Sequence, residues 1–197
     1  MNKKFKKYKI CTVVGTRPEI IRLSLIIKKF EKEFDHTLIH TGQNFDPELS
    51  KIFFHDLDLK LPKFQINSFS GNAIGTISKS LVEVDKILDK VNPDAFFILG
   101  DTNSALTSIC AKKRKIPIFH YEAGNRSFDQ RVPEEANRKI VDSISDINLT
   151  YSHLSKLNLI NEGHLSDRVI NVGSPMLEVL NFYKNKISNS KILKKLK

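Results

Sequence analysis

The stretch "IPIFHYEAGNRSFDQRVPEEANRKIVD", residues 116–142, contains one full repeat of the pattern that decides the fold. It opens with an apolar run, 116–121, whose β-branched and aromatic residues are typical of a buried strand. Gly124 permits a tight turn. Pro133 suits the first turn of a helix that we predict over 134–144. A strand, a highly charged loop and a helix therefore follow one another directly.

The same alternation runs through the whole chain. It predicts a parallel sheet with helices on both faces, which is the Rossmann-like form of an α/β fold. The other strands are predicted at 9–14, 36–41, 95–99, 147–150 and 169–172, and the other helices at 18–30, 73–91, 104–114, 152–162 and 176–185. The apolar helix faces are expected to consist of Ile21, Leu25 and Ile26 in the first helix, and of Ile74, Ile77, Leu81, Val84 and Leu88 in the second.

The positive charge of the chain lies mainly at its two ends. The formal net charge is +10, but residues 1–9 hold five lysines and residues 184–197 hold six, with no acidic residue in either segment. The body, 10–183, keeps 21 basic and 22 acidic residues and is close to neutral. We therefore expect no nucleic-acid partner, because a binding groove would need basic residues on the folded body.

The remaining composition is that of a protein of the cytoplasm. Cys11 and Cys110 both lie in apolar runs, as expected for free buried cysteines, and no Cys/His cluster has the spacing of a zinc site. No apolar run approaches the roughly 20 residues that span a bilayer, so no membrane partner is expected.

Residues just after the strands should gather at one edge of a parallel sheet, where ligands bind. After the first strand, Thr16 and Glu19 have the spacing of a capping box. That role leaves Arg17 unexplained, because a cation opposes the dipole at the start of a helix unless an anion neutralises it. Arg17 and Arg22 are therefore a candidate clamp for a phosphate or carboxylate.

Three further post-strand carboxylates are candidates for acid and base chemistry. Asp101 follows the strand at 95–99 and could be a helix cap or a catalytic group. Glu122 follows Tyr121 and has no role in starting a helix, whereas Glu134 and Glu135 both lie at a helix start. If these strands are neighbours, Asp101, Glu122 and a glutamate at 134–135 converge, and their charges raise one another's pKa.

Other charged and titratable residues are given structural roles or none. Arg126, Arg131 and Arg138 are expected in structural ion pairs. His40 and His120 lie in strands and are expected to be buried in the core. No role is assigned to His55, His153 or His164.

Taken together, the loops resemble one enzyme family. The stretches "VVGTRPEIIR", "HTGQNFD", "LGDTNS", "IPIFHYEAGNRSFDQRVPEEANRKIVD" and "VGSP" occur in family order between Val13 and Pro175. Each is weak alone, but the set is similar to the non-hydrolysing UDP-N-acetylglucosamine 2-epimerases.

This resemblance implies a GT-B architecture, in which two Rossmann-like domains enclose the active site of a homodimer that uses neither cofactor nor metal. It implies inversion at C2 of a UDP-N-acetylhexosamine, by elimination of UDP to a glycal and its re-addition. By matching position, Asp101, Glu122 and Glu134 correspond to acid/base carboxylates, and Arg17 and Arg22 to substrate-binding cations.

The chain departs from the family pattern in length. Its expected organisation is a basic tail at 1–9, a Rossmann-like catalytic domain at 10–175, and an interdomain helix with a basic tail at 176–197. Measured against the family pattern, these 197 residues are expected to correspond to the N-terminal half, without the family's C-terminal nucleotide-binding domain. We therefore expect the chain alone to bind UDP-sugar poorly and to turn it over little or not at all.

The motifs also bear on the sugar and on regulation. The segment Asn125–Gln130 and "VGSP" look closer to the branch that forms UDP-N-acetyl-L-fucosamine than to the enzymes acting on UDP-N-acetylglucosamine. Gln43 is a candidate substrate-binding residue. By position it matches a residue that, in relatives, contacts an activating UDP-N-acetylglucosamine. Asp46 replaces a second glutamine and 65–72 lacks an arginine, so activation is not expected here.

Three alternatives stay open. A GT-B glycosyltransferase would share the architecture but would not usually need all three carboxylates. A catalytically silent half could act as the binding partner of a separate chain. A nucleic-acid module is the weakest of the three.

Overall fold

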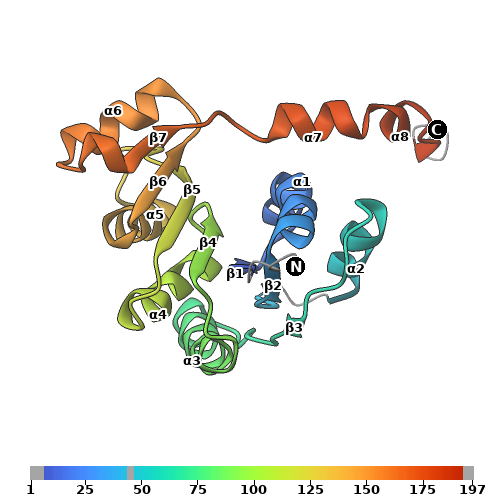
Figure 1. The fold of residues 1–197 in the computed structure, drawn as a ribbon, viewed down its shortest axis with the longest axis horizontal. Coiled ribbons are helices and arrows are strands. Elements are labelled where there is room, and N and C mark those ends of the chain that lie inside the picture. The colour runs from blue at the N-terminus through green and yellow to red at the C-terminus, as the bar shows by residue number, and fades with distance from the viewer. Residues whose placement is uncertain (1–6, 44–46, 193–197) are drawn as a thin grey trace, which may run out of the picture.

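The computed structural model describes residues 7–43 and 47–192 of the 197-residue chain. Within these residues the strands form one parallel sheet of seven strands, in the order β3-β2-β1-β4-β5-β6-β7 (Figure 1). The strands are β1 (Lys9–Val14), β2 (Asp35–His40), β3 (Phe64–Gln65), β4 (Ala95–Leu99), β5 (Ile118–Ala123), β6 (Ile147–Thr150) and β7 (Val169–Asn171).

The helices connect these strands, and the predicted α/β alternation is confirmed. The α-helices are α1 (Arg17–Glu33), α2 (Pro47–Asp56), α3 (Ala73–Val91), α4 (Ser108–Lys113), α5 (Pro133–Ile144), α6 (His153–Asn161), α7 (Met176–Phe182) and α8 (Lys184–Ser188). The 3-10 helices are η1 (Asn103–Thr107) and η2 (Ser166–Arg168).

The predicted elements differ from the structure in several details. The strand predicted at 116–121 is β5, which runs two residues further, and the helix predicted at 104–114 is divided into η1 and α4. The hydroxyl of Thr107 donates to the Ser104 carbonyl, and such side-chain bonds compete with the regular helix pattern. Two short elements, α2 and β3, were not predicted.

Helices cover both faces of the sheet (Figure 1), and an apolar layer lies between the helices and the strands on each face. On one face, Cys11, Val13, Phe96, Ile98 and Ile118 pack beneath α3, α4 and α5. On the other face, α1 and Phe54 of α2 cover residues of β1, β2, β4 and β5. Both cysteines are free and buried, as predicted.

The apolar faces of two helices were predicted only in part. In α1 the buried apolar residues are Ile20, Leu23 and Ile27, while the predicted Ile21, Leu25 and Ile26 are only partly buried. This helix is apolar around much of its circumference, so packing rather than pattern selects its buried face. In α3 the predicted Ile74 is 75% exposed, whereas Val84 and Leu88 are buried.

The strand order reverses direction between β1 and β4. In sheets of this kind the loops after the two central strands diverge to opposite faces and leave a crevice at their carboxyl ends. Glu19 of α1, the helix after β1, connects to the loop after β4, because its carboxylate accepts a 2.5 Å hydrogen bond from the Thr102 hydroxyl.

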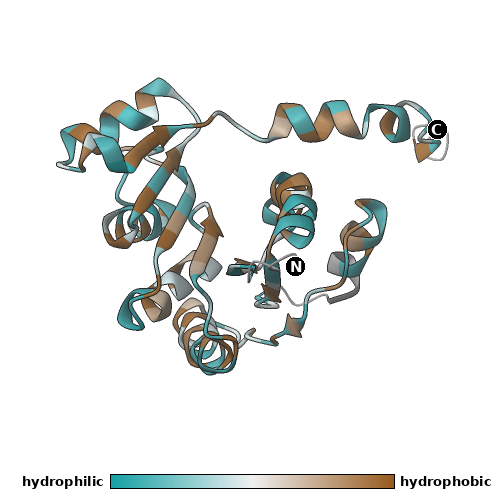
Figure 2. Ribbon diagram, in the orientation of Figure 1, coloured by the Kyte–Doolittle hydropathy of each residue, from teal (hydrophilic) through white to brown (hydrophobic). Residues whose placement is uncertain are grey.

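The last helices return to the side of α1 and α2. Tyr183, between α7 and α8, is buried and its hydroxyl donates to the Leu57 carbonyl at 2.6 Å. Lys28 of α1 donates to the same hydroxyl at 3.0 Å, and Lys186 lies 5.7 Å from the ring centroid. Hydrophobic residues are visible along α7 in Figure 2, and Leu177 is 68% exposed.

No helix among the described residues is long and apolar enough to cross a membrane.

Candidate functional site at the carboxyl edge of the sheet

The predicted site residues lie at the carboxyl ends of the strands. Asp101 follows β4, Glu122 is the second-last residue of β5, and Gln43 lies after β2. Arg17 is the first residue of α1, and Arg22 lies within its first two turns. Loops from β1, β2, β4 and β5 therefore meet at one edge, as expected for a parallel sheet.

Glu122 is the most constrained carboxylate of this edge. Its backbone has φ +75°, and the pairing of β5 with β6 is irregular between Tyr121 and Ala123. Its carboxylate contacts Arg22 Nη1 at 2.6 Å, and its side chain is 15% exposed. Burial raises the pKa of Glu122, and although Arg22 opposes this effect, nearby Asp101 adds to it.

Gly100 allows this close approach. It has φ +76°, and a Cβ atom at this position would lie 3.2 Å from Oε2 of Glu122. Any side chain here would be strained and would crowd the carboxylate. The carboxylate of Glu122 therefore packs directly against the main chain at Gly100.

Asp101 forms an ion pair with Arg138 of α5. The first residue before η1 is Thr102, so the helix-cap role considered for Asp101 is not what the structure shows. Asn137 also donates to the Asp101 backbone carbonyl at 2.9 Å. Two residues of α5 therefore fix the position of Asp101.

The two glutamates at the start of α5 differ sharply. Glu135 is buried and accepts hydrogen bonds from the Ser127 backbone N–H at 3.0 Å and from Arg138 at 2.8 Å. Burial would raise its pKa, but the bonds from Ser127 and the charge of Arg138 hold the pKa below its usual value. Glu134 is exposed in the first turn of the helix.

Arg17 and Arg22 begin α1 in different environments. Arg17 is exposed, and Arg22 is already paired with Glu122. Glu19, between them, is buried and accepts hydrogen bonds from the N–H groups of Gly15 at 2.5 Å and Thr16 at 2.8 Å. This is the bond that the predicted capping box requires of Glu19. Burial raises the pKa of Glu19, although its hydrogen bonds oppose that effect.

Gln43 lies at the side of this edge. It lines a cavity of about 310 Å³ together with Asn72 at the start of α3 and Asn103 of η1. Asp46, which was considered together with Gln43, lies outside the described residues.

Two residues of this edge were not predicted as part of the site. Arg138 forms ion pairs, as expected, with Glu135 and also with the site residue Asp101. Tyr151 follows β6 directly, and its ring packs edge-on against Tyr121 with centroids 5.2 Å apart. Burial and then the charge of Glu122 raise the pKa of Tyr151. Its position after a strand could have identified it.

The predicted structural roles of other residues are confirmed. Arg126 pairs with Asp142 at 2.8 Å and with Glu162, and Arg131 pairs with Asp129 at 2.8 Å. His40 and His120 are buried in their strands. Within the described ranges no three His, Cys, Asp or Glu side chains are placed to hold a metal ion.

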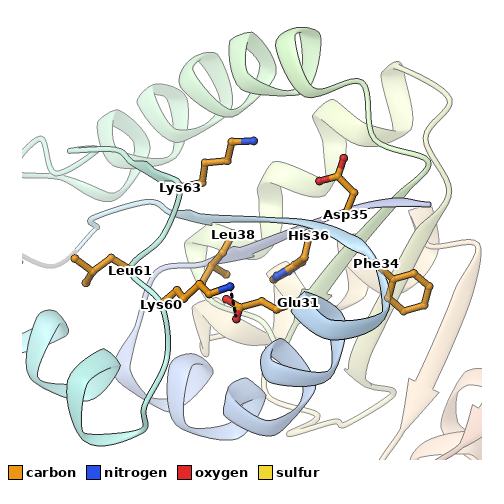
Figure 3. A pocket seen from close by; sticks show the side chains of 8 residues that line it. All are labelled: Glu31, Phe34, Asp35, His36, Leu38, Lys60, Leu61 and Lys63. Carbon is orange, nitrogen blue, oxygen red and sulfur yellow. Dashed lines mark ion pairs between the residues drawn. The ribbon is translucent and has the colours of Figure 1, made fainter. Parts of the chain in front are cut away.

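A second cavity, of about 270 Å³, lies at the opposite end of β2 (Figure 3). It is lined by residues from the end of α1 and the start of β2, and by Lys60 and Lys63 before β3. Its one drawn ion pair joins Lys60 and Glu31 at 3.5 Å. This cavity is at the amino end of a parallel strand and holds none of the predicted site residues.

Comparison with known proteins identifies the family. A family model described as UDP-N-acetylglucosamine 2-epimerase matches residues 28–197. The chain belongs to the UDP-N-acetylglucosamine 2-epimerase family. The fold is also that of solved members: the structure of UDP-N-acetylglucosamine 2-epimerase from Rickettsia bellii has a TM-score of 0.91 and 48% sequence identity, over 96% of this chain and 51% of that one.

Two further family members extend the comparison. The Methanocaldococcus jannaschii UDP-GlcNAc 2-epimerase, solved in complex with UDP-GlcNAc and UDP, has a TM-score of 0.90 and 37% identity, over 95% of this chain and 52% of that one. A UDP-2,3-diacetamido-2,3-dideoxy-D-glucuronate 2-epimerase from Pseudomonas aeruginosa is 36% identical over 89% of this chain and 51% of its own length. The chain spans about half the length of its curated epimerase-family relatives.

Proposed function

We propose that this chain carries the acid/base half of a UDP-N-acetylhexosamine C2 epimerase. The observation that supports this most strongly is Glu122, a nearly buried carboxylate held 2.6 Å from Arg22 at the crevice of the sheet, with a raised pKa. A carboxyl group with raised proton affinity is suited to take and return a proton.

The proposed reaction is a redox-neutral elimination followed by re-addition. A carboxylate removes the proton from C2, the C1–O bond to UDP breaks with its electrons, and a C1–C2 double bond forms. Protonation at C2 on the opposite face and re-addition of UDP at C1 complete the inversion. The candidates for proton transfer are Asp101, Glu122 and Glu134.

The departing UDP carries the charge that the cations of α1 would neutralise. Arg17 is exposed at the first position of the helix, where backbone N–H groups also favour an anion. Arg22 lies further along the same helix, beside Glu122. We assign substrate binding to Arg17 and Arg22, and contact with a nucleotide sugar to Gln43.

The substrate class is a UDP-linked N-acetylhexosamine, either UDP-N-acetylglucosamine converted to UDP-N-acetylmannosamine, or the equivalent sugar on the route to UDP-N-acetyl-L-fucosamine. The segment Asn125–Gln130 is the proposed selector. Residues 10–175 would form the catalytic domain and 176–197 the connection to a second domain, in a cytoplasmic homodimer.

The decisive test is proton exchange at C2, followed by NMR in deuterated water with candidate UDP-sugars. It should be run on residues 1–197 alone and on a chimera that joins them to the second half of the 48% identical Rickettsia bellii protein. We expect deuterium at C2 and inverted product with the chimera, and little or none with the chain alone. A chimera that binds UDP-sugar but exchanges no C2 proton contradicts the proposal, and sugar transfer to an acceptor would favour a glycosyltransferase.

A further inference from the structure

Beneath Asp101 and the end of β5 that carries Glu122 lies a group of fully buried polar and charged side chains. The side chains of His120 on β5 and Asp142 on α5 are both 0% exposed, and Arg126 joins them at 0%. Burying charge is costly unless each group is paired and hydrogen-bonded. The proposed reaction gives these residues no direct role, so their placement calls for another explanation.

His120 has an acceptor on each side of its ring. Its Nε2 lies 2.9 Å from the Gly100 carbonyl oxygen, and its Nδ1 lies 2.8 Å from a carboxylate oxygen of Asp142. The ring of His120 thus connects the main chain after β4 to the carboxylate of Asp142.

Asp142 gathers donors from the loop after β5. Both of its oxygens lie 3.3 Å from the Gly124 backbone nitrogen, and one accepts from Arg126 at 2.8 Å. Burial would raise the pKa of Asp142, but the bonds and charges of His120 and Arg126 outweigh it and hold the pKa below its usual value. Asp142 is therefore ionised, and it holds one loop while His120 holds the other.

The backbone at these contacts is in the left-handed region. Gly100 has φ +76°, Glu122 has φ +75° and Gly124 has φ +76°. For a glutamate this conformation costs free energy and persists only where the surroundings impose it. The contact at Gly100 directly precedes Asp101, and the contact at Gly124 follows Glu122 by two residues.

We propose that His120 and Asp142 are positioning residues, which hold Asp101 and Glu122 in place for proton transfer without touching the sugar. This inference rests on the proposed function for what the carboxylates do, whereas the arrangement itself does not depend on it. A displacement of a reacting group by about 1 Å can lower the reaction rate by about 10²-fold. Weakening the contact between His120 and Asp142 should therefore lower kcat far more than it weakens substrate binding.

The kinetic test compares Asp142→Asn with Asp146→Asn in the chimera. Asp146 is a matched control, because its carboxylate accepts a 2.9 Å hydrogen bond from the Ile118 N–H at the other end of β5. We expect kcat to fall about 100-fold in Asp142→Asn with KM within about threefold, and to stay within about twofold in Asp146→Asn. An equal kcat in the two variants, or a loss carried by KM, overturns the proposal.

A second test needs no activity and uses the wild-type 197-residue chain. In ¹⁵N-histidine-labelled protein, NMR detects a ring N–H that is buried and held by an acceptor, and His120→Gln assigns the signal. We expect a His120 ring N–H that exchanges slowly with solvent; a ring N–H in fast exchange overturns the proposal even if no variant folds.

Amide exchange then measures whether the pair holds the loops. The Gly124 N–H should exchange at least about tenfold faster in Asp142→Asn than in Asp146→Asn, and equal rates contradict a positioning role. A chimera without epimerisation would reject the proposed function alone, because the exchange rates of the ring and backbone N–H groups are measured independently of it.

Discussion

Carboxylates lie at both ends of the sheet, but they have different partners at each end. At the amino end, Asp94 accepts the Lys9 backbone N–H at 2.8 Å, and Asp146 accepts the Ile118 N–H at 2.9 Å. At the carboxyl end, Asp101 pairs with Arg138 and Glu122 contacts Arg22. Asp94 and Asp146 thus hold the main chain at the start of a strand. Asp101 and Glu122 instead contact arginine side chains beside the crevice.

The proton affinities of the two ends differ in the same way. Burial would raise the pKa of Asp146, but its bonds to Lys112 and to the Ile118 N–H hold the pKa below its usual value. At Glu122, burial together with the charge of Asp101 keeps the pKa above its usual value despite Arg22. A carboxylate stabilised in its ionised form suits a structural role, whereas one with raised proton affinity suits acid/base chemistry.

The largest effect is expected from Glu122→Gln in the chimera. The amide keeps the shape of the side chain but cannot carry the proton, so C2 exchange should fall by about 10³-fold. Deuterium uptake followed by NMR measures it. Epimerisation at the wild-type rate in this variant would remove the functional difference between the two ends of the sheet.

The next effect concerns stability at the carboxyl end. Glu19→Ala removes the carboxylate that accepts from the buried Gly15 N–H, the partly buried Thr16 N–H and the Thr102 hydroxyl. We expect the free energy of unfolding to fall by about 3 kcal/mol, measured by urea denaturation. Glu31→Ala, on the same helix but in a surface pair with Lys60, should cost less than about 1 kcal/mol. Similar losses in both variants would contradict this account.

The pH dependence of stability should have opposite signs at the two ends. Because the pKa of Glu122 is raised on folding, the folded chain keeps this proton above the ordinary glutamate pKa while the unfolded chain loses it. Through that window the wild type should lose stability relative to Glu122→Gln as pH rises. The pKa of Asp146 is lowered, so the wild type should lose stability relative to Asp146→Asn as pH falls towards and below the ordinary aspartate pKa. Denaturation at a series of pH values checks both slopes, and equal signs would contradict the comparison.

The smallest effect is expected from Asp94→Asn at the amino end. This change weakens one exposed hydrogen bond, to the Lys9 N–H, and should cost about 1 kcal/mol or less. C2 exchange by the chimera should stay within about twofold of the wild type. A large loss of exchange without a loss of stability would show that carboxylates at the amino end also affect catalysis.

Much of the fold follows from local pattern, because helix and strand periods are written in consecutive residues. The helix predicted at 73–91 is exact, and the strands at 9–14, 95–99 and 147–150 match the structure. The two-residue strand β3 is too short to carry a period, and it pairs with β2 only once the sheet exists. Local pattern also leaves the buried side of α1 undecided.

The site was predicted less completely, because its contacts join distant parts of the chain. Sequence position alone indicated that Asp101 and Glu122 lie at the ends of two strands, and it left open whether these strands are neighbours, as the structure shows them to be. It could not indicate that Arg138 reaches Asp101, 37 residues away, since the nearby Glu135 already offered a partner three residues before it. The double contact of His120 likewise depends on Gly100 and Asp142, which meet only after β4, β5 and α5 have packed.

Tyr183 has a mechanical consequence. Its hydroxyl is bonded to both Lys28 of α1 and the Leu57 carbonyl, so the chain after β7 is fastened to the side of the molecule that carries α1. A force applied at Ile192 is therefore transmitted to α1 and to the end of α2 before it is transmitted to β7. Arg17 and Arg22 lie on the same helix as Lys28, so the contact at Tyr183 connects the C-terminal segment to the helix that carries both cations.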